Sequence, residues 1–101
     1  MKLKEVRNFL EDLNKDKIFF DSHFYRRCKE RPVDEGMVRN FLCRIDKLER
    51  IQEGNNGRLK LWFRMSGKYS LVLVVEIFIS KGLKVISAWN SDKKWQKKLR
   101  R

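Results

Sequence analysis

The sequence predicts an α+β domain in which N-terminal helices pack on a four-stranded antiparallel meander sheet. Apolar residues recur every three or four positions in the first half of the chain and every second position in the second half. Short turn segments, EGNNGR, SGK and SKG, separate the alternating stretches, and turns this short join antiparallel neighbours. With 101 residues, 42% of them hydrophobic, we expect one domain over residues 1–92. Residues 93–101 should form a basic C-terminal helix or tail.

Three helices are expected, at residues 2–14, 22–30 and 34–44. Apolar residues at helical spacing define the first, namely Leu3, Val6, Phe9, Leu10 and Leu13. The segment KIFF is then expected to be a short extended stretch, followed by the residue that caps the second helix, Asp21 or Ser22. Pro32 ends the second helix, and Asp34 caps the third. The same apolar stripe defines the third helix, at Val38, Phe41, Leu42 and Ile45.

Four strands are expected, at residues 47–52, 58–65, 69–79 and 83–89. The third of them is apolar on both faces, which is typical of a strand in the middle of a sheet. We expect the helices to cover one face of the sheet.

Charge and composition narrow the classes of function. Lys and Arg number 25 against 13 acidic residues, a net charge of +12, which predicts contact with nucleic acid or with an acidic partner. The segment KKWQKKLRR alone carries six of these positive charges. No apolar run approaches a membrane span, so a cytoplasmic location is expected. One histidine and two cysteines fifteen positions apart, Cys28 and Cys43, predict no metal site, no cofactor and two buried thiols.

The only histidine lies in a basic segment of the second predicted helix. His23, Arg27 and Glu30 have the spacing i, i+4 and i+7, which brings them to one face, with Arg31 adjacent. One interpretation is structural: a hydrogen-bonded histidine beside an Arg27–Glu30 surface ion pair. The other is catalytic, because a histidine can exchange protons at neutral pH.

The predicted strand 58–65 gives a second signal. Alternation assigns Leu59, Leu61, Phe63 and Met65 to one face and Arg58, Lys60, Trp62 and Arg64 to the other. Cations interleaved with an indole suit single-stranded nucleic acid, which offers phosphates and unstacked bases. The alternative is a solvated face with cation–π contacts. Further candidate contacts with nucleic acid, each with a packing alternative, are Trp89, Lys94, Trp95, Lys97 and Lys98.

The spacing H-x-x-x-R-x-x-E-R, followed by a helix and by strands ending in VISAW, resembles small toxin-like families related to BrnT and to the RelE/ParE superfamily. The resemblance covers about residues 18–90. It implies a compact ribonuclease-like fold, metal-independent cleavage of mRNA by attack of a ribose 2′-hydroxyl, and a co-encoded acidic antitoxin. Carried over to this chain, it makes His23 the proton-transfer residue, Arg27 and Arg31 phosphate ligands, and Arg64 the cation that stabilises the transition state.

The leading hypothesis is therefore a toxin-like RNA endonuclease of a toxin–antitoxin pair, with RNA over the sheet, and the resemblance extends this substrate to ribosome-bound mRNA. Two alternatives remain open. The first is a non-catalytic nucleic-acid-binding module, and the second is an interaction protein whose basic surface serves an acidic partner. The catalytic hypothesis requires the helix cations and Arg64 to meet at one phosphate.

Overall fold

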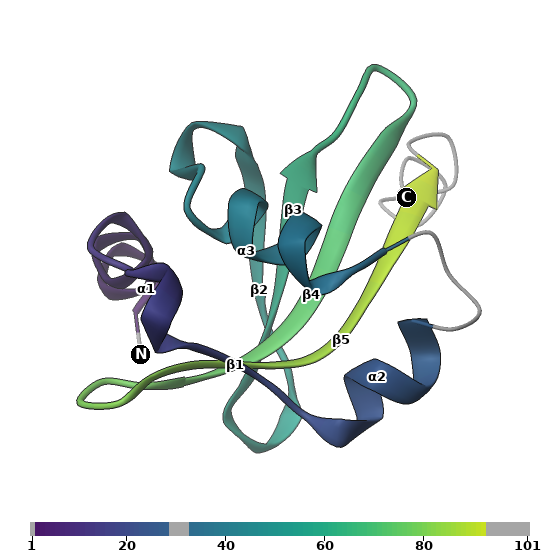
Figure 1. Cartoon of the computed structure of the whole chain (residues 1–101). Coiled ribbons are helices and arrows are strands. Elements are labelled where there is room, and N and C mark those ends of the chain that lie inside the picture. The colour runs from purple at the N-terminus through teal and green to yellow at the C-terminus, as the bar shows by residue number, and fades with distance from the viewer. Residues whose placement is uncertain (1, 29–32, 93–101) are drawn as a thin grey trace.

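The structure, a computed structural model, describes residues 2–28 and 33–92, and Figure 1 follows the chain from purple near the N-terminus to yellow at the last strand. The helices of this part are α1 (Leu3–Glu11), α2 (Ser22–Cys28) and α3 (Glu35–Leu42). Its strands are β1 (Ile18–Phe20), β2 (Leu48–Glu53), β3 (Arg58–Arg64), β4 (Tyr69–Phe78) and β5 (Gly82–Asp92). Short 3-10 turns lie at Lys15–Lys17, Ile45–Lys47 and Asn55–Gly57.

The strands form one mixed sheet in the order β1-β5-β4-β3-β2. The pairs β2–β3, β3–β4 and β4–β5 are antiparallel, in agreement with the tight turns of the sequence. The expectation of four antiparallel strands was nevertheless wrong, because β1 pairs in parallel with Leu83–Val85 of β5. A strand of three residues is too short to have a readable alternation, and its partner lies far along the chain.

Helices α1 and α3 are shorter than predicted, and after α1 a side-chain bond starts a new turn. The side chain of Asn14 accepts a hydrogen bond from the Asp16 amide and so begins the turn that follows α1. Asp34 caps α3 as predicted, since its carboxylate accepts from the Met37 amide at 2.9 Å. Within the described residues α2 ends at Cys28, and the rest of its predicted span lies outside them.

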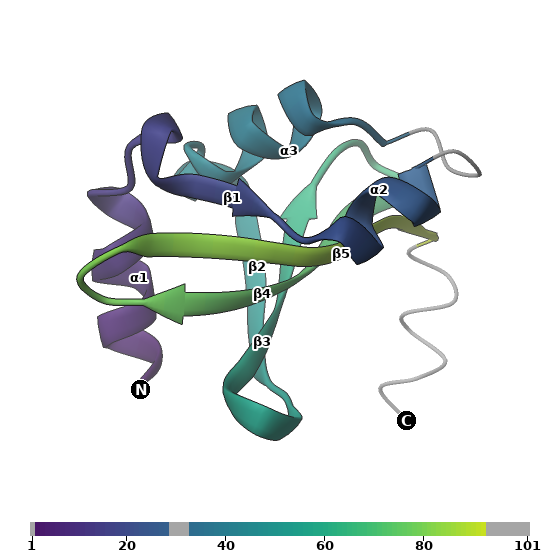
Figure 2. The same cartoon turned by 60° about the horizontal axis from the view of Figure 1, so that its bottom comes forward.

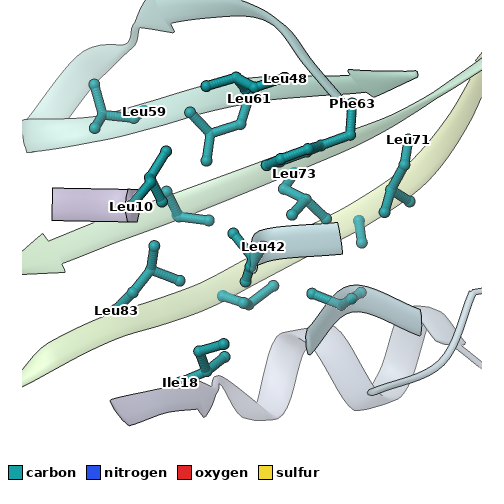
Figure 3. Close-up of a cluster of buried hydrophobic side chains, with 14 of the residues drawn as sticks. Leu10, Ile18, Leu42, Leu48, Leu59, Leu61, Phe63, Leu71, Leu73 and Leu83 are labelled. Carbon is teal, nitrogen blue, oxygen red and sulfur yellow. The ribbon is translucent and has the colours of Figure 1, made fainter. Parts of the chain in front are cut away.

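The hydrophobic core lies between one face of the sheet and the helices (Figure 3). Leu61 and Phe63 of β3 are fully buried there, as the alternation predicted. Leu10 of α1 and Leu42 of α3 pack against them from the helix side. At about 25 cal/mol per Å² of apolar surface, this cluster is the main source of stability.

Strand β4 is in the middle of the sheet, and it is apolar on both faces as expected for that position. Leu73 belongs to the core cluster, while Val72 is equally buried on the opposite face, with 1% of its surface exposed. The centre of the sheet face opposite the helices is therefore partly buried.

Helix α2 lies along β5, beyond the point where β1 ends (Figures 1 and 2). Its Phe24 side chain is 1% exposed and belongs to the core cluster. Since His23 and Arg27 are a helical turn apart and both exposed, they form a different side of the helix from Phe24. Helix α2 thus contributes to the core and also to the edge of the second sheet face.

Candidate nucleic-acid interface

We call the side of the sheet opposite the core cluster the open face. Residues that are directly opposite each other in antiparallel strands point to the same side, so the register arranges this face in cross-strand rows. In order along β3, the rows are Arg58–Glu76–Lys84, Lys60–Val74–Ser87, Trp62–Val72–Trp89 and Arg64–Ser70–Ser91, and β2 adds Gln52 beside Lys60 and Arg50 beside Trp62.

Cations and indole rings contact one another across the middle of the open face. The guanidinium carbon of Arg50 lies 4.8 Å from the Trp62 ring centroid, and the Lys60 ammonium lies 5.6 Å from the rings of both Trp62 and Trp89. Trp62 is 8% exposed, so little of its ring is open to a base. The sequence left base stacking and cation–π contacts open for Trp62, and its ring makes cation–π contacts with Arg50 and Lys60.

The cations of the open face differ in their acidic partners. Arg58 Nε lies 3.2 Å from a Glu76 carboxylate oxygen, and Lys84 Nζ lies 3.3 Å from a carboxylate oxygen of Asp21. Within the described residues, Arg50, Lys60 and Arg64 form no ion pair. No described carboxylate therefore competes with an anionic ligand for these three side chains in an ion pair.

The start of α2 is fixed to β5 by Asp21. The Asp21 backbone amide donates to the Val85 carbonyl at 2.9 Å, and its carboxylate accepts from the His23 amide at 2.8 Å. That bond from the His23 amide, with a smaller contribution from Lys84, lowers the pKa of the Asp21 carboxyl. The His23 backbone is therefore held by the Asp21 side chain, and the Asp21 backbone is bonded to β5.

A pocket of about 580 Å³ lies where α2 meets the open face. His23 and Arg27 line it from α2, and Arg58 lines it from β3. Trp89 of β5 adds an aromatic surface, and the remaining lining is Val74, Ile86 and Ser87 of the two central strands. The pocket thus combines a titratable imidazole, two guanidinium groups and an indole, which is a set suited to a phosphate attached to a base.

The sequence grouped Arg64 with His23 and Arg27, but Arg64 does not line this pocket. Arg58 and Arg64 point to the same face from opposite ends of β3, roughly 20 Å apart at 3.3 Å per residue. The pocket lining includes Arg58, which the sequence had assigned only to nucleic-acid binding. Lys60 is on the same face, between the two arginines.

Six of the residues singled out in the sequence lie outside the described part of the chain. They are Glu30, Arg31, Lys94, Trp95, Lys97 and Lys98.

Because of two β-bulges, the alternation pattern of the sequence does not predict every residue of the open face. The register of β2 shifts between Leu48 and Arg50, and that of β4–β5 shifts between Val74 and Val75. A bulge moves all later side chains to the other face of the strand. Plain alternation therefore does not assign Arg50 or Ser87 to the open face, and neither was a sequence candidate.

Comparisons of the chain with protein-family models, with curated proteins and with solved structures found no match. Fold and site geometry are thus the basis of any functional argument.

The residues described by the structure include no helix that is both long enough and apolar enough to pass through a membrane. In the same part of the chain, no three His, Cys, Asp or Glu side chains come together in a way that could hold a metal ion. The Cys43 thiol is free and lies 3.8 Å from the Leu13 carbonyl oxygen.

Proposed function

We propose that this protein is a toxin-like RNA endonuclease of the mRNA interferase type, with a RelE/BrnT-like fold and a metal-independent mechanism. The observation that carries the proposal is the pocket in which His23, Arg27 and Arg58 come together from α2 and β3. An imidazole that lines one pocket with two guanidinium groups offers a proton acceptor and positive charge for attack of a ribose 2′-hydroxyl on the adjacent phosphate. The resemblance of the α2 segment to BrnT-related and RelE-related families supports the same reaction.

In this mechanism His23 accepts the proton of the 2′-hydroxyl. The 2′ oxygen bonds to phosphorus, the bond from phosphorus to the 5′ oxygen breaks, and water supplies the proton that the leaving 5′ oxygen takes up. Arg27 and Arg58 hold the phosphate and stabilise the negative charge that develops on it. Arg58 thereby takes the role that the resemblance gave to Arg64. The products are a 2′,3′-cyclic phosphate and a free 5′-hydroxyl.

The rest of the open face holds the RNA chain outside the pocket. Arg50, Lys60 and Arg64 carry charge without an acidic partner among the described residues, so each can neutralise a phosphate. The same excess of positive charge would let an acidic antitoxin cover this face and block access of RNA.

The test is cleavage of an end-labelled single-stranded RNA in the presence of EDTA. Wild type should generate cyclic-phosphate ends, and His23→Gln should cut at least 100-fold more slowly, which is the usual contribution of a proton-transfer residue. Arg27→Gln should also lose most activity. The matched control is Arg26→Gln, which removes the neighbouring cation of α2 that does not line the pocket. Equal rates for wild type and His23→Gln would refute the proposal.

A second candidate is an RNA-binding module without cleavage. The observation that favours it is the set of cation–π contacts among Arg50, Lys60, Trp62 and Trp89, which needs no histidine. This candidate predicts that RNA binds to wild type and to His23→Gln with equal affinity and that neither protein cleaves it.

A further inference from the structure

We propose that the pocket between α2 and the open face binds a single unpaired nucleotide, with its phosphate on Arg27 and Arg58 and its base against Trp89. The inference rests on the proposed function and deepens it, because it specifies which form of RNA the site accepts.

The dimensions suit one nucleotide. Arg58 and Trp89 belong to β3 and β5, which flank β4 and are about 10 Å apart at the usual strand spacing. Trp89 is in the cross-strand row of Trp62, four residues along β3 from Arg58, so the two side chains line the pocket from diagonally opposite positions. The volume of about 580 Å³ is in the range of small-molecule sites, and a nucleotide fits with room for water.

Charged and apolar groups occupy different parts of the pocket lining. Arg27 and Arg58 are exposed and belong to separate elements, so they can approach one phosphate from two sides. Val74 and Ile86 line the pocket from β4 and β5, and Ile86 is 6% exposed. An apolar lining next to an indole suits the flat face of a base.

Two polar groups set the orientation and the chemistry of the bound nucleotide. The Ser87 hydroxyl belongs to the same lining as Val74 and can donate to or accept from the edge of a base. The Lys60 ammonium, 5.6 Å from the Trp89 ring, adds positive charge next to the stacking surface. Once the base is in contact with Trp89, the ribose lies between the base and the phosphate, within reach of His23.

The consequence is selection for unpaired RNA. A base that contacts Trp89 has left the stack of its own strand and lost its pairing partner, so a fully paired strand pays an unstacking and unpairing cost that a loop or single strand avoids. The site should therefore accept loops and single strands and reject duplexes of the same sequence.

Binding of adenosine 3′-monophosphate tests this site without requiring cleavage. The dissociation constant is measured by NMR titration of the amide and indole signals of the full chain. We expect Trp89→Leu to weaken binding at least tenfold and Trp89→Phe to weaken it less than threefold, because an aromatic face remains. The matched control is Tyr69→Leu, an exposed aromatic residue of β4 on the helix-covered side, which should leave binding unchanged. The unfolding curve of each variant checks that it is folded.

Two further comparisons show whether the nucleotide binds through its base and phosphate together or through its phosphate alone. A single-stranded RNA should compete with the nucleotide, and the matching duplex should compete at least tenfold less well. Inorganic phosphate binding as tightly as the nucleotide, or equal competition by the duplex, would overturn the nucleotide site. Trp89-dependent binding without any RNA cleavage would support the nucleotide site and refute the endonuclease proposal. Cleavage with no dependence on Trp89 would refute the nucleotide site alone.

Discussion

Gly82 begins β5 at the place where the chain passes Lys17. Its φ of 131° belongs to a region that L side chains rarely adopt, and a Cβ at this position would collide with the Lys17 carbonyl. The parallel pairing of β1 with β5 starts at the next residue, Leu83. This glycine therefore permits the contact between two segments that are far apart in the sequence.

Gly82→Ala should lower the free energy of unfolding by about 2 kcal/mol or more, since it adds backbone strain and a steric clash. Urea denaturation measures the effect. Gly67→Ala is the matched control, because a Cβ there meets nothing within 4 Å, and it should change stability by less than about 0.5 kcal/mol. Equal effects of the two substitutions would contradict the close approach.

Asp21 should make stability depend on pH in the acid range. The amide of His23 and the ammonium of Lys84 lower the pKa of this carboxyl in the folded protein. Its stabilising effect is therefore complete above the unfolded pKa of about 3.9 and is lost as pH falls through the lower folded pKa. Asp21→Asn keeps a capping side chain but removes the titration, so its unfolding midpoint should fall less than that of wild type between pH 5 and pH 2. Parallel pH profiles would contradict this role.

At the scale of single elements, α2 explains which part of the site was predictable. The helical spacing predicted that His23 and Arg27 share one side of the helix, and both line the pocket, while Phe24 is buried on another side. The spacing within a helix says nothing about which end of a distant strand lies beside it. Arg58 and Arg64 are equivalent in the alternation of β3, and only the packing of α2 along β5 distinguishes them.

The packing of α3 against β1 and the turn before it also depends on Arg39. Its guanidinium donates to the carbonyls of Lys15 and Ile18, at 2.6 and 3.1 Å, and lies 4.9 Å from the Phe20 ring centroid. Arg39→Met keeps much of the apolar stem but removes these bonds, so it should lower the free energy of unfolding by about 2 kcal/mol. The neighbouring control Asn40→Ala removes one exposed hydrogen bond, from the Lys15 ammonium at 2.8 Å, and should cost less than about 1 kcal/mol. Thermal or urea unfolding of both variants measures the difference.

At the scale of the whole molecule, the α+β class and the three antiparallel pairs followed from periodicity and turns. These features are local, so a single sequence contains them. The parallel strand β1 and the two bulges depend on contacts between distant segments and left no local pattern. The two faces of β3 were predictable because alternation is a local pattern. The composition of the pocket was not predictable, because the pocket depends on contacts between distant segments.

The net charge of +12 should appear in the salt dependence of RNA binding. For a single strand, the slope of log K against log salt is about −0.7 for each phosphate neutralised. Lys60→Gln should therefore make the slope shallower by about 0.7, since this ammonium is directed toward the open face. Arg7→Gln on α1 removes the same charge elsewhere and should leave the slope unchanged. A uniform change in both variants would indicate binding by net charge alone.

The central claim is that the pocket at α2, rather than the open face in general, is where RNA is cleaved. The most direct measurement compares single-turnover cleavage by Arg58→Gln and Arg64→Gln at saturating RNA. Arg58→Gln should lose at least 100-fold in rate constant, because it stabilises charge at the reacting phosphate. Arg64→Gln should weaken RNA binding and lose less than tenfold in rate constant. A large loss for Arg64→Gln with little change for Arg58→Gln would contradict the assignment of the site.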